Sequence, residues 1–114
     1  DESAPAADGT RQATLALDWQ ALAPLPFDAN LFFQALDTRG ATPRIVAQID
    51  APPAADRPAT TWRAGDLFAE RYVLDLPAGA PQGLTYYLGF YNWQDGARLP
   101  VNGGLADKLI LYGR

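Results

Sequence analysis

The residues of this chain best suited to binding chemistry lie close together in the second half of the sequence. Tyr87, Tyr91 and Trp93 supply flat aromatic rings, and Asn92 and Asp95 supply an amide and a carboxylate. An aromatic ring can stack on the apolar face of a pyranose while neighbouring polar groups bond its hydroxyls. The segment is therefore a candidate sugar contact. The competing interpretation is that Trp93 folds back onto a sheet and both tyrosines belong to a core.

Other residue types that carry chemistry are scarce. The chain has no cysteine and no histidine, and its one serine is Ser3. Thiolate nucleophiles, imidazole bases and the usual zinc ligands are therefore excluded. Glycoside hydrolysis needs two carboxylates across a cleft, and we read the two candidate pairs, Asp66 with Glu70 and Asp95 with Asp107, as solvated charges. The loops also lack the acidic density that calcium requires, so we predict no catalytic residue, no cofactor and no metal.

Charge and hydropathy narrow the range of partners. The net charge is −4, and the cations are eight scattered arginines and Lys108. A nucleic-acid-binding domain needs a basic face, so nucleic acid is excluded as a partner. The apolar runs are shorter than the roughly 20 residues of a membrane helix, which argues against direct membrane insertion. Because the chain contains no methionine, we expect it to be a piece of a longer protein.

Alternation of apolar and polar residues is the main structural signal. Residues 1–11 are polar and alanine-rich and are expected to form a flexible lead-in. The alternation then predicts strands at residues 12–20, 30–37, 44–50, 67–76, 84–92, 97–101 and 107–112. The long connection at 51–66 suits a crossing between sheets. We therefore predict one domain over residues 12–114, an all-β, immunoglobulin- or fibronectin-III-like two-sheet sandwich of about seven antiparallel strands.

The same alternation assigns side chains to faces. Ile45, Ala47 and Ile49 should share one face of the third strand. Tyr87 and Tyr91 should share the face of the fifth strand that lies opposite Leu88 and Phe90. Of the other aromatic residues, we expect Trp19 to be a core residue and Trp62 to close one end of the sandwich.

Six short segments follow one another in an unusual order. They read LALDWQALAPL (15–25), FFQALD (32–37), IVAQIDAPP (45–53), TTWRAGD (60–66), DLP (75–77) and GFYN (89–92). Over residues 13–112 this series resembles the β-sandwich domains found C-terminal to multi-spanning bacterial glycosyltransferases of the dolichyl-phosphate-mannose mannosyltransferase type. Relatives usually open with one further strand before the position of Ala13, so the resemblance also suggests an unpaired edge strand here.

The resemblance implies a non-catalytic accessory domain on the extracytoplasmic side of a membrane protein, at the cell surface or in a periplasm-like space. Its role would be scaffolding, docking or shaping access to the membrane-embedded part, where the chemistry is done. Two alternatives remain open from the residues themselves. One is a carbohydrate-binding module that uses the aromatic hairpin tip. The other is a self-association module that forms a homodimer through the unpaired edge strand.

Overall fold

The computed structural model describes residues 1–22, 25, 27, 29–53, 57–92, 94–99 and 108–112. Within this part of the chain, six strands form two antiparallel sheets. The elements are β1 (Arg11–Gln20), β2 (Ala29–Asp37), β3 (Arg44–Ala51), the 3-10 turn η1 (Ala59–Thr61), β4 (Leu67–Leu76), β5 (Thr85–Asn92) and β6 (Leu109–Tyr112). The prediction of an all-β chain of two packed antiparallel sheets is confirmed.

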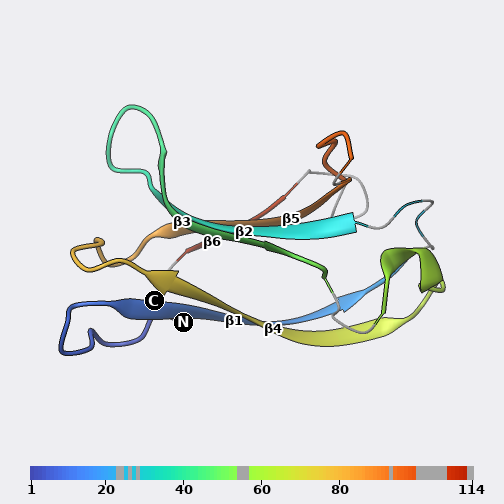
Figure 1. Cartoon of the computed structure of the whole chain (residues 1–114), viewed down its shortest axis with the longest axis horizontal. Helices are drawn as coiled ribbons and strands as arrows, with labels where there is room; N and C mark the ends of the chain where they lie inside the picture. Colours follow the sequence, from blue (N-terminus) through green and yellow to red (C-terminus); the bar gives the residue numbers. More distant parts are fainter. Residues whose placement is uncertain are drawn as a thin grey trace.

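The two sheets lie one above the other as separate layers (Figure 1). One sheet has the order β1–β4, and the other has the order β3–β2–β5–β6. The connection after β3 runs through η1 and returns the chain to the sheet of β1 and β4. The predicted crossing between sheets over residues 51–66 is therefore present.

The strand predicted at residues 97–101 is not found at residues 97–99, and residues 100 and 101 lie outside the described residues. The described residues contain six strands rather than the predicted seven. A turn that starts at Asn92 brings this segment back beside β5, but the two pair only through an isolated bridge between Tyr91 and Arg98. Pro100 follows directly in the sequence. Proline has no backbone N–H to donate to a ladder, which limits how far a strand can continue there.

The main core lies between the two sheets and follows the alternation of the strands. Leu31, Phe33 and Ala35 of β2 are at most 2% exposed, and Leu74 and Leu76 of β4 face them at 1%. Full burial of one such large side chain is worth about 1.5–3 kcal/mol. Because adjacent side chains point to opposite faces, the residues between these core positions are directed to the outer face of each sheet.

Strand β3 departs from the expected phase. The pairing of β2 with β3 shifts between Ala35 and Leu36, so that Leu36 lies opposite Ile45 instead of Val46. This β-bulge places an extra residue on β3. Val46 therefore packs against the core with Ala47 and Ile49, and Ile45 is 51% exposed. The prediction that Ile45 shares the face of Ala47 and Ile49 is wrong for this reason.

A second cluster closes the end of the sandwich near η1. Trp62 is 6% exposed and packs with Phe68, Ala21 and Ala29. Its indole N–H donates to the backbone oxygen of Arg57 at 2.9 Å. The ring of Trp19 stacks on that of Phe68 at 4.3 Å between centroids. The expected end closure by Trp62 is confirmed, whereas Trp19, expected in the core, is partly buried and packs against this end cluster.

The N-terminal lead-in makes specific contacts with the sandwich. Asp1 and Ser3 form backbone hydrogen bonds with Thr14 and Gln12 along the free edge of β1. The Glu2 side chain turns toward the interior and is 4% exposed. Arg11, expected as the last residue of the lead-in, is the first residue of β1. No helix in the described residues is long and apolar enough to cross a membrane.

Candidate functional site

The candidate site is the outer face of the four-stranded sheet, the face directed away from β1 and β4. We call it the outer face. Its side chains come from Asn30, Phe32, Gln34 and Leu36 of β2, from Tyr87 and Tyr91 of β5, and from residues beside them on β3 and β6. The connection between β2 and β3 and the segment 94–99 both rise from the sheet on this side (Figure 1). The two loops therefore bound the outer face at its two ends.

The register of the strands arranges the outer face in rows. Gln48, Gln34, Tyr87 and Ile110 lie side by side across the four strands. The next row holds Asp50, Phe32 and Gly89, and the row beyond it holds Asn30, Tyr91 and Arg98. The outer face thus carries aromatic, amide and charged side chains close together.

The row of Tyr91 combines an amide, a phenol and a guanidinium. The Asn30 amide donates to the Tyr91 hydroxyl at 3.4 Å. The Phe32 ring lies 6.3 Å from that of Tyr91, between centroids. The guanidinium carbon of Arg98 stands 4.7 Å above the Phe32 ring, within the range of a cation–π contact. Phe32 is only 5% exposed although it lies on the outer face.

The row of Tyr87 combines a phenol with two amides, and Lys108 approaches the ring from beside the row. The Lys108 ammonium nitrogen lies 5.0 Å from the centre of the Tyr87 ring. Beside the ring, the Gln34 amide donates to the amide oxygen of Gln48 at 3.3 Å. Tyr87 is half-buried, and Ile110 beside it is 50% exposed. A half-buried phenol, two amides and an ammonium group thus lie close together here.

The structure separates the five residues that the sequence singled out. Tyr87 and Tyr91 share the outer face, as their alternation with Leu88 and Phe90 requires. Asn92 has the opposite parity, and its amide oxygen accepts the backbone N–H of Gln94 at 3.0 Å. Asp95 accepts the backbone N–H of Ala97 at 2.8 Å. Asn92 and Asp95 therefore act as turn residues, and Trp93 lies outside the described residues.

Several residues of the outer face were not predicted from the sequence. They are Asn30, Gln34, Gln48, Arg98 and Lys108. The polar residues of β2 stand at every second position, and this was the available signal for Asn30 and Gln34. Arg98 and Lys108 reach the face only because their segments return beside β5, which depends on long-range pairing.

The carboxylates whose pKa is displaced serve turns and the N-terminal segment. The backbone N–H of Arg63 and the guanidinium of Arg57, which lies 2.8 Å from Asp66, lower the pKa of Asp66. Hydrogen bonds from Thr10 lower the pKa of Asp8. A catalytic general acid needs a raised pKa instead. Among the described residues, no three acidic side chains lie close enough to share a metal ion.

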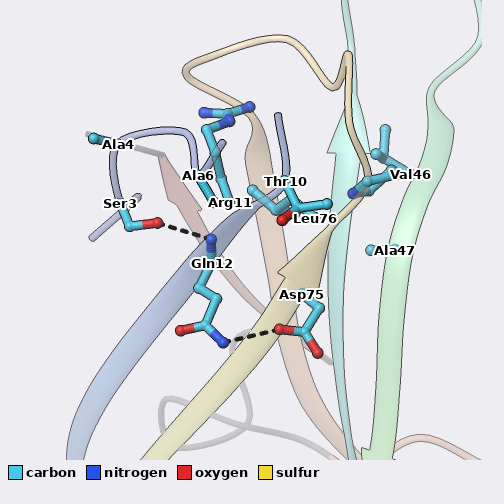
Figure 2. Close-up of a pocket in the computed structure, with 11 residues that line it drawn as sticks. Ser3, Ala4, Ala6, Thr10, Arg11, Gln12, Val46, Ala47, Asp75 and Leu76 are labelled. Atoms are coloured by element: carbon cyan, nitrogen blue, oxygen red, sulfur yellow. Dashed lines mark hydrogen bonds between the residues drawn. The ribbon is translucent and has the colours of Figure 1, made fainter. Parts of the chain in front are cut away.

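A concave region lies at the opposite end of the sandwich from the Trp62 cluster. It is a groove of about 600 Å³ between β1, β3, β4 and the N-terminal segment. Figure 2 shows Gln12 in this groove bonded to Ser3 and to Asp75. The Arg11 guanidinium is also engaged, donating to backbone oxygens of the loop before β5. Much of the remaining lining is small and apolar, including three alanines, so the groove offers fewer groups for recognition than the outer face.

The fold is that of a small all-β chain with two packed antiparallel sheets. Comparisons of the chain with protein-family models, with curated proteins and with solved structures found no match.

Proposed function

We propose that this chain is a non-catalytic accessory domain on the extracytoplasmic side of a larger bacterial, glycosyltransferase-like membrane protein. Its role there is scaffolding, docking or shaping access to the membrane-embedded part. The observation that carries the proposal is where the resembling segments fall. LALDWQ, FFQALD and IVAQIDA lie on β1, β2 and β3, TTWRAGD spans η1 and the approach to β4, and GFYN ends β5. The resemblance thus follows the strands of a sandwich, as the family's domain requires.

We also infer that the sandwich is of the fibronectin-III type. The order β1–β4 in one sheet and β3–β2–β5–β6 in the other fits that arrangement without its first strand. Asp1 and Ser3 pair with β1 on the edge where such a strand would lie. This placement supports the inference that the polar N-terminal segment substitutes for the additional strand of the resembling domains.

The non-catalytic part of the proposal is supported by the roles of the acidic side chains. Glu2, Asp8, Asp37 and Asp66 all have a lowered pKa, and each accepts hydrogen bonds from nearby groups of the chain. Hydrogen bonds to the charged form stabilise it and favour ionisation. These carboxylates accept hydrogen bonds that stabilise the folded chain, and they are poorly placed to exchange protons with a substrate.

The parent gene provides the test. We expect the coding sequence around this domain to encode several membrane-spanning segments. Deletion of residues 12–112 from the parent should leave its membrane insertion intact and lower sugar transfer to its acceptor. A gene without a membrane-spanning region, or full transfer activity after the deletion, would contradict the proposal.

A second candidate function is carbohydrate binding, favoured by the grouping of Tyr87, Tyr91, Asn30 and Gln34 on the outer face. Isothermal titration calorimetry with a panel of mono- and oligosaccharides tests it. Saturable binding that Tyr91→Ala weakens, and that Val73→Ala on the outer face of the β1–β4 sheet leaves unchanged, would support this function. The absence of binding heat across the panel would reject it.

A further inference from the structure

We propose that the site that holds Glu2 is a binding site for an extended segment of a partner polypeptide that carries a glutamate. In this structure the chain's own N-terminal segment, residues 1–3, occupies the site. The segment is thus a resident ligand that a partner has to displace. The site belongs to the sandwich itself and does not depend on the membrane-embedded parent that we propose.

The receptor for the glutamate carboxylate is assembled from distant parts of the chain. One carboxylate oxygen of Glu2 accepts the Tyr86 hydroxyl at 2.5 Å and the backbone N–H of Leu84 at 3.2 Å. The other oxygen accepts the backbone N–H of Gly83 at 3.0 Å and the Arg11 guanidinium at 3.3 Å. Each oxygen therefore has two donors and the receptor includes a cation, which favours a carboxylate over an amide.

The donors are held by contacts that do not involve Glu2. The Arg11 guanidinium also donates to two backbone oxygens of the loop before β5, at 2.8 and 2.6 Å. The Tyr86 ring lies 5.7 Å from that of Phe33 in the main core, between centroids. These contacts do not depend on the N-terminal segment, so the receptor is pre-organised for another carboxylate.

The remaining contacts of the segment are those of an added β-strand. The Asp1 ammonium donates to the backbone oxygen of Thr14 at 2.9 Å, and the Thr14 N–H donates to the Asp1 oxygen at 2.8 Å. The Ser3 N–H donates to the Gln12 oxygen at 2.8 Å. Strand addition through backbone groups, with pockets for alternate side chains, is a recurrent mode of peptide recognition. Another extended segment can form the same backbone bonds.

The N-terminal segment leaves space beside it. The groove of about 600 Å³ lies next to a second concave region of about 490 Å³. Ser3, Ala4 and Arg11 line both regions, and Figure 2 shows them from the side of the groove. Because serine and alanine are small, a partner with larger side chains after its glutamate gains contacts that this segment does not make.

The connection from the segment to β1 permits displacement. Residues 3–8 are exposed. The backbone bonds from Gly9 to Ala6 and from Ala6 to Thr10 close a local turn. Residues 1–3 can therefore leave the receptor while β1 keeps its pairing with β4.

The test measures binding of a peptide to the full chain. The probe is the peptide DESAPA, the sequence of residues 1–6, with a fluorophore at its C-terminus, and fluorescence anisotropy reports binding. We expect Glu2→Ala, which empties the receptor, to bind this peptide about tenfold or more tightly than the parent chain, where the resident segment competes. The control is Asp18→Ala, which removes the same charge from an exposed position of β1 and should bind no better than the parent chain.

Matched changes test the receptor itself. A peptide with Glu2→Gln should bind the Glu2→Ala chain about tenfold or more weakly, as for loss of charge-assisted hydrogen bonds. A peptide with Glu2→Asp should also bind more weakly, because its carboxylate is one methylene short of the four donors. Tyr86→Phe, added to the Glu2→Ala chain, removes one donor and should lower the affinity for the original peptide several-fold.

Two results would overturn the proposal. One is equal affinity of the Glu2→Ala chain for the glutamate and glutamine peptides. The other is the absence of saturable binding to this chain when its circular dichroism matches that of the parent, since Glu2 would then only anchor the chain's own N-terminus. If Glu2→Ala does not fold, Ser3→Pro replaces it, because it removes the N–H that bonds Gln12 and leaves the receptor intact. Affinity of Ser3→Pro no higher than that of the parent chain would overturn the proposal equally.

Discussion

At the scale of single residues, the most connected group is the carboxylate of Glu2. It accepts hydrogen bonds from the Tyr86 hydroxyl at 2.5 Å and from the backbone N–H of Gly83 at 3.0 Å. It also pairs with Arg11 at 3.3 Å, and each of these two charged side chains is only 4% exposed. Burial opposes ionisation of Glu2, but these hydrogen bonds and the charge of Arg11 outweigh it and lower the pKa of Glu2. Burial of Tyr86, together with its hydrogen bond to Glu2 and the negative charge of Glu2, raises the pKa of Tyr86, and the charge of Arg11 opposes this rise.

Replacement of Glu2 should therefore lower the free energy of unfolding substantially, although Glu2 is the second residue of the sequence. Glu2→Gln leaves the Arg11 charge buried without its partner, and loss of one member of a buried pair costs about 3 kcal/mol or more. Urea unfolding followed by circular dichroism measures the loss. Asp8→Asn is the control, since Asp8 bonds only its neighbour Thr10 on the surface. Equal stabilities of Glu2→Gln and Asp8→Asn would contradict this account.

Asp37 predicts a specific pH dependence. Hydrogen bonds from the side chain and backbone of Arg39 lower the pKa of Asp37 from 3.8 to about 2. A lowered pKa stabilises the folded state above the unfolded value, and this stabilisation is lost as pH falls toward the folded value. The stability difference between the parent chain and Asp37→Asn should thus shrink between pH 3.8 and about pH 2. A difference that stays constant over this range would show that Asp37 does not contribute through its charge.

At the scale of elements, the free edge of β1 is the least protected part of the fold. Asp1 and Ser3 pair with Thr14 and Gln12, but no described strand pairs with this edge beyond Thr14. Open strand edges are templates for pairing with other chains. The predicted homodimer would use this edge, and the N-terminal residues restrict access to it.

Removal of Asp1–Ser3 should therefore promote self-association. Without these residues, the outward backbone groups of Gln12 and Thr14 join those of Ala16 and Asp18 in one continuous edge. Light scattering over a range of concentrations should give a mass that rises more steeply for the truncated chain. Glu2→Gln controls for loss of the buried ion pair without loss of the edge pairing. Identical mass curves for the truncated chain and Glu2→Gln would rule out protection of the edge.

The positions of most strands could be predicted from the sequence because the alternation of apolar and polar residues depends only on neighbouring residues. The alternation placed Tyr87 and Tyr91 together and put Leu88 and Phe90 in the core. It failed at Ile45, since a β-bulge depends on the pairing of two distant strands. The outer face was recovered only in part for the same reason. Arg98 and Lys108 reach the tyrosines through pairing with β5, and the turn roles of Asn92 and Asp95 depend on backbone geometry.

The bulge in β3 makes a direct mutational prediction. Ile45→Asp places a charge on an exposed position and should change the stability by only about 0.5 kcal/mol. Val46→Asp places the same charge against the core and should cost about 2 kcal/mol or more. Thermal unfolding of the two variants gives the comparison. Without the bulge, the order of the two losses would be reversed.

At the scale of the whole molecule, the two apolar clusters are linked through one residue. Trp19 lies 4.8 Å from Trp62 and 4.3 Å from Phe68 in the end cluster, measured between ring centroids. It also lies 5.6 Å from Phe90, which packs against the main core. Aromatic pairs at such distances contribute beyond their buried area. Loss of packing at the end should therefore affect the whole sandwich.

This linkage predicts that the sandwich unfolds in one step. In a Trp93→Phe background, the two remaining indoles report on the end cluster, and circular dichroism reports on both sheets. The two signals should give the same urea midpoint, as for a two-state domain. Trp62→Ala should shift both midpoints together and cost about 3–5 kcal/mol, a large part of a typical domain's total of about 5–15 kcal/mol. A fluorescence midpoint below that of circular dichroism would instead mean that the end cluster unfolds separately and that Trp19 does not couple the two clusters.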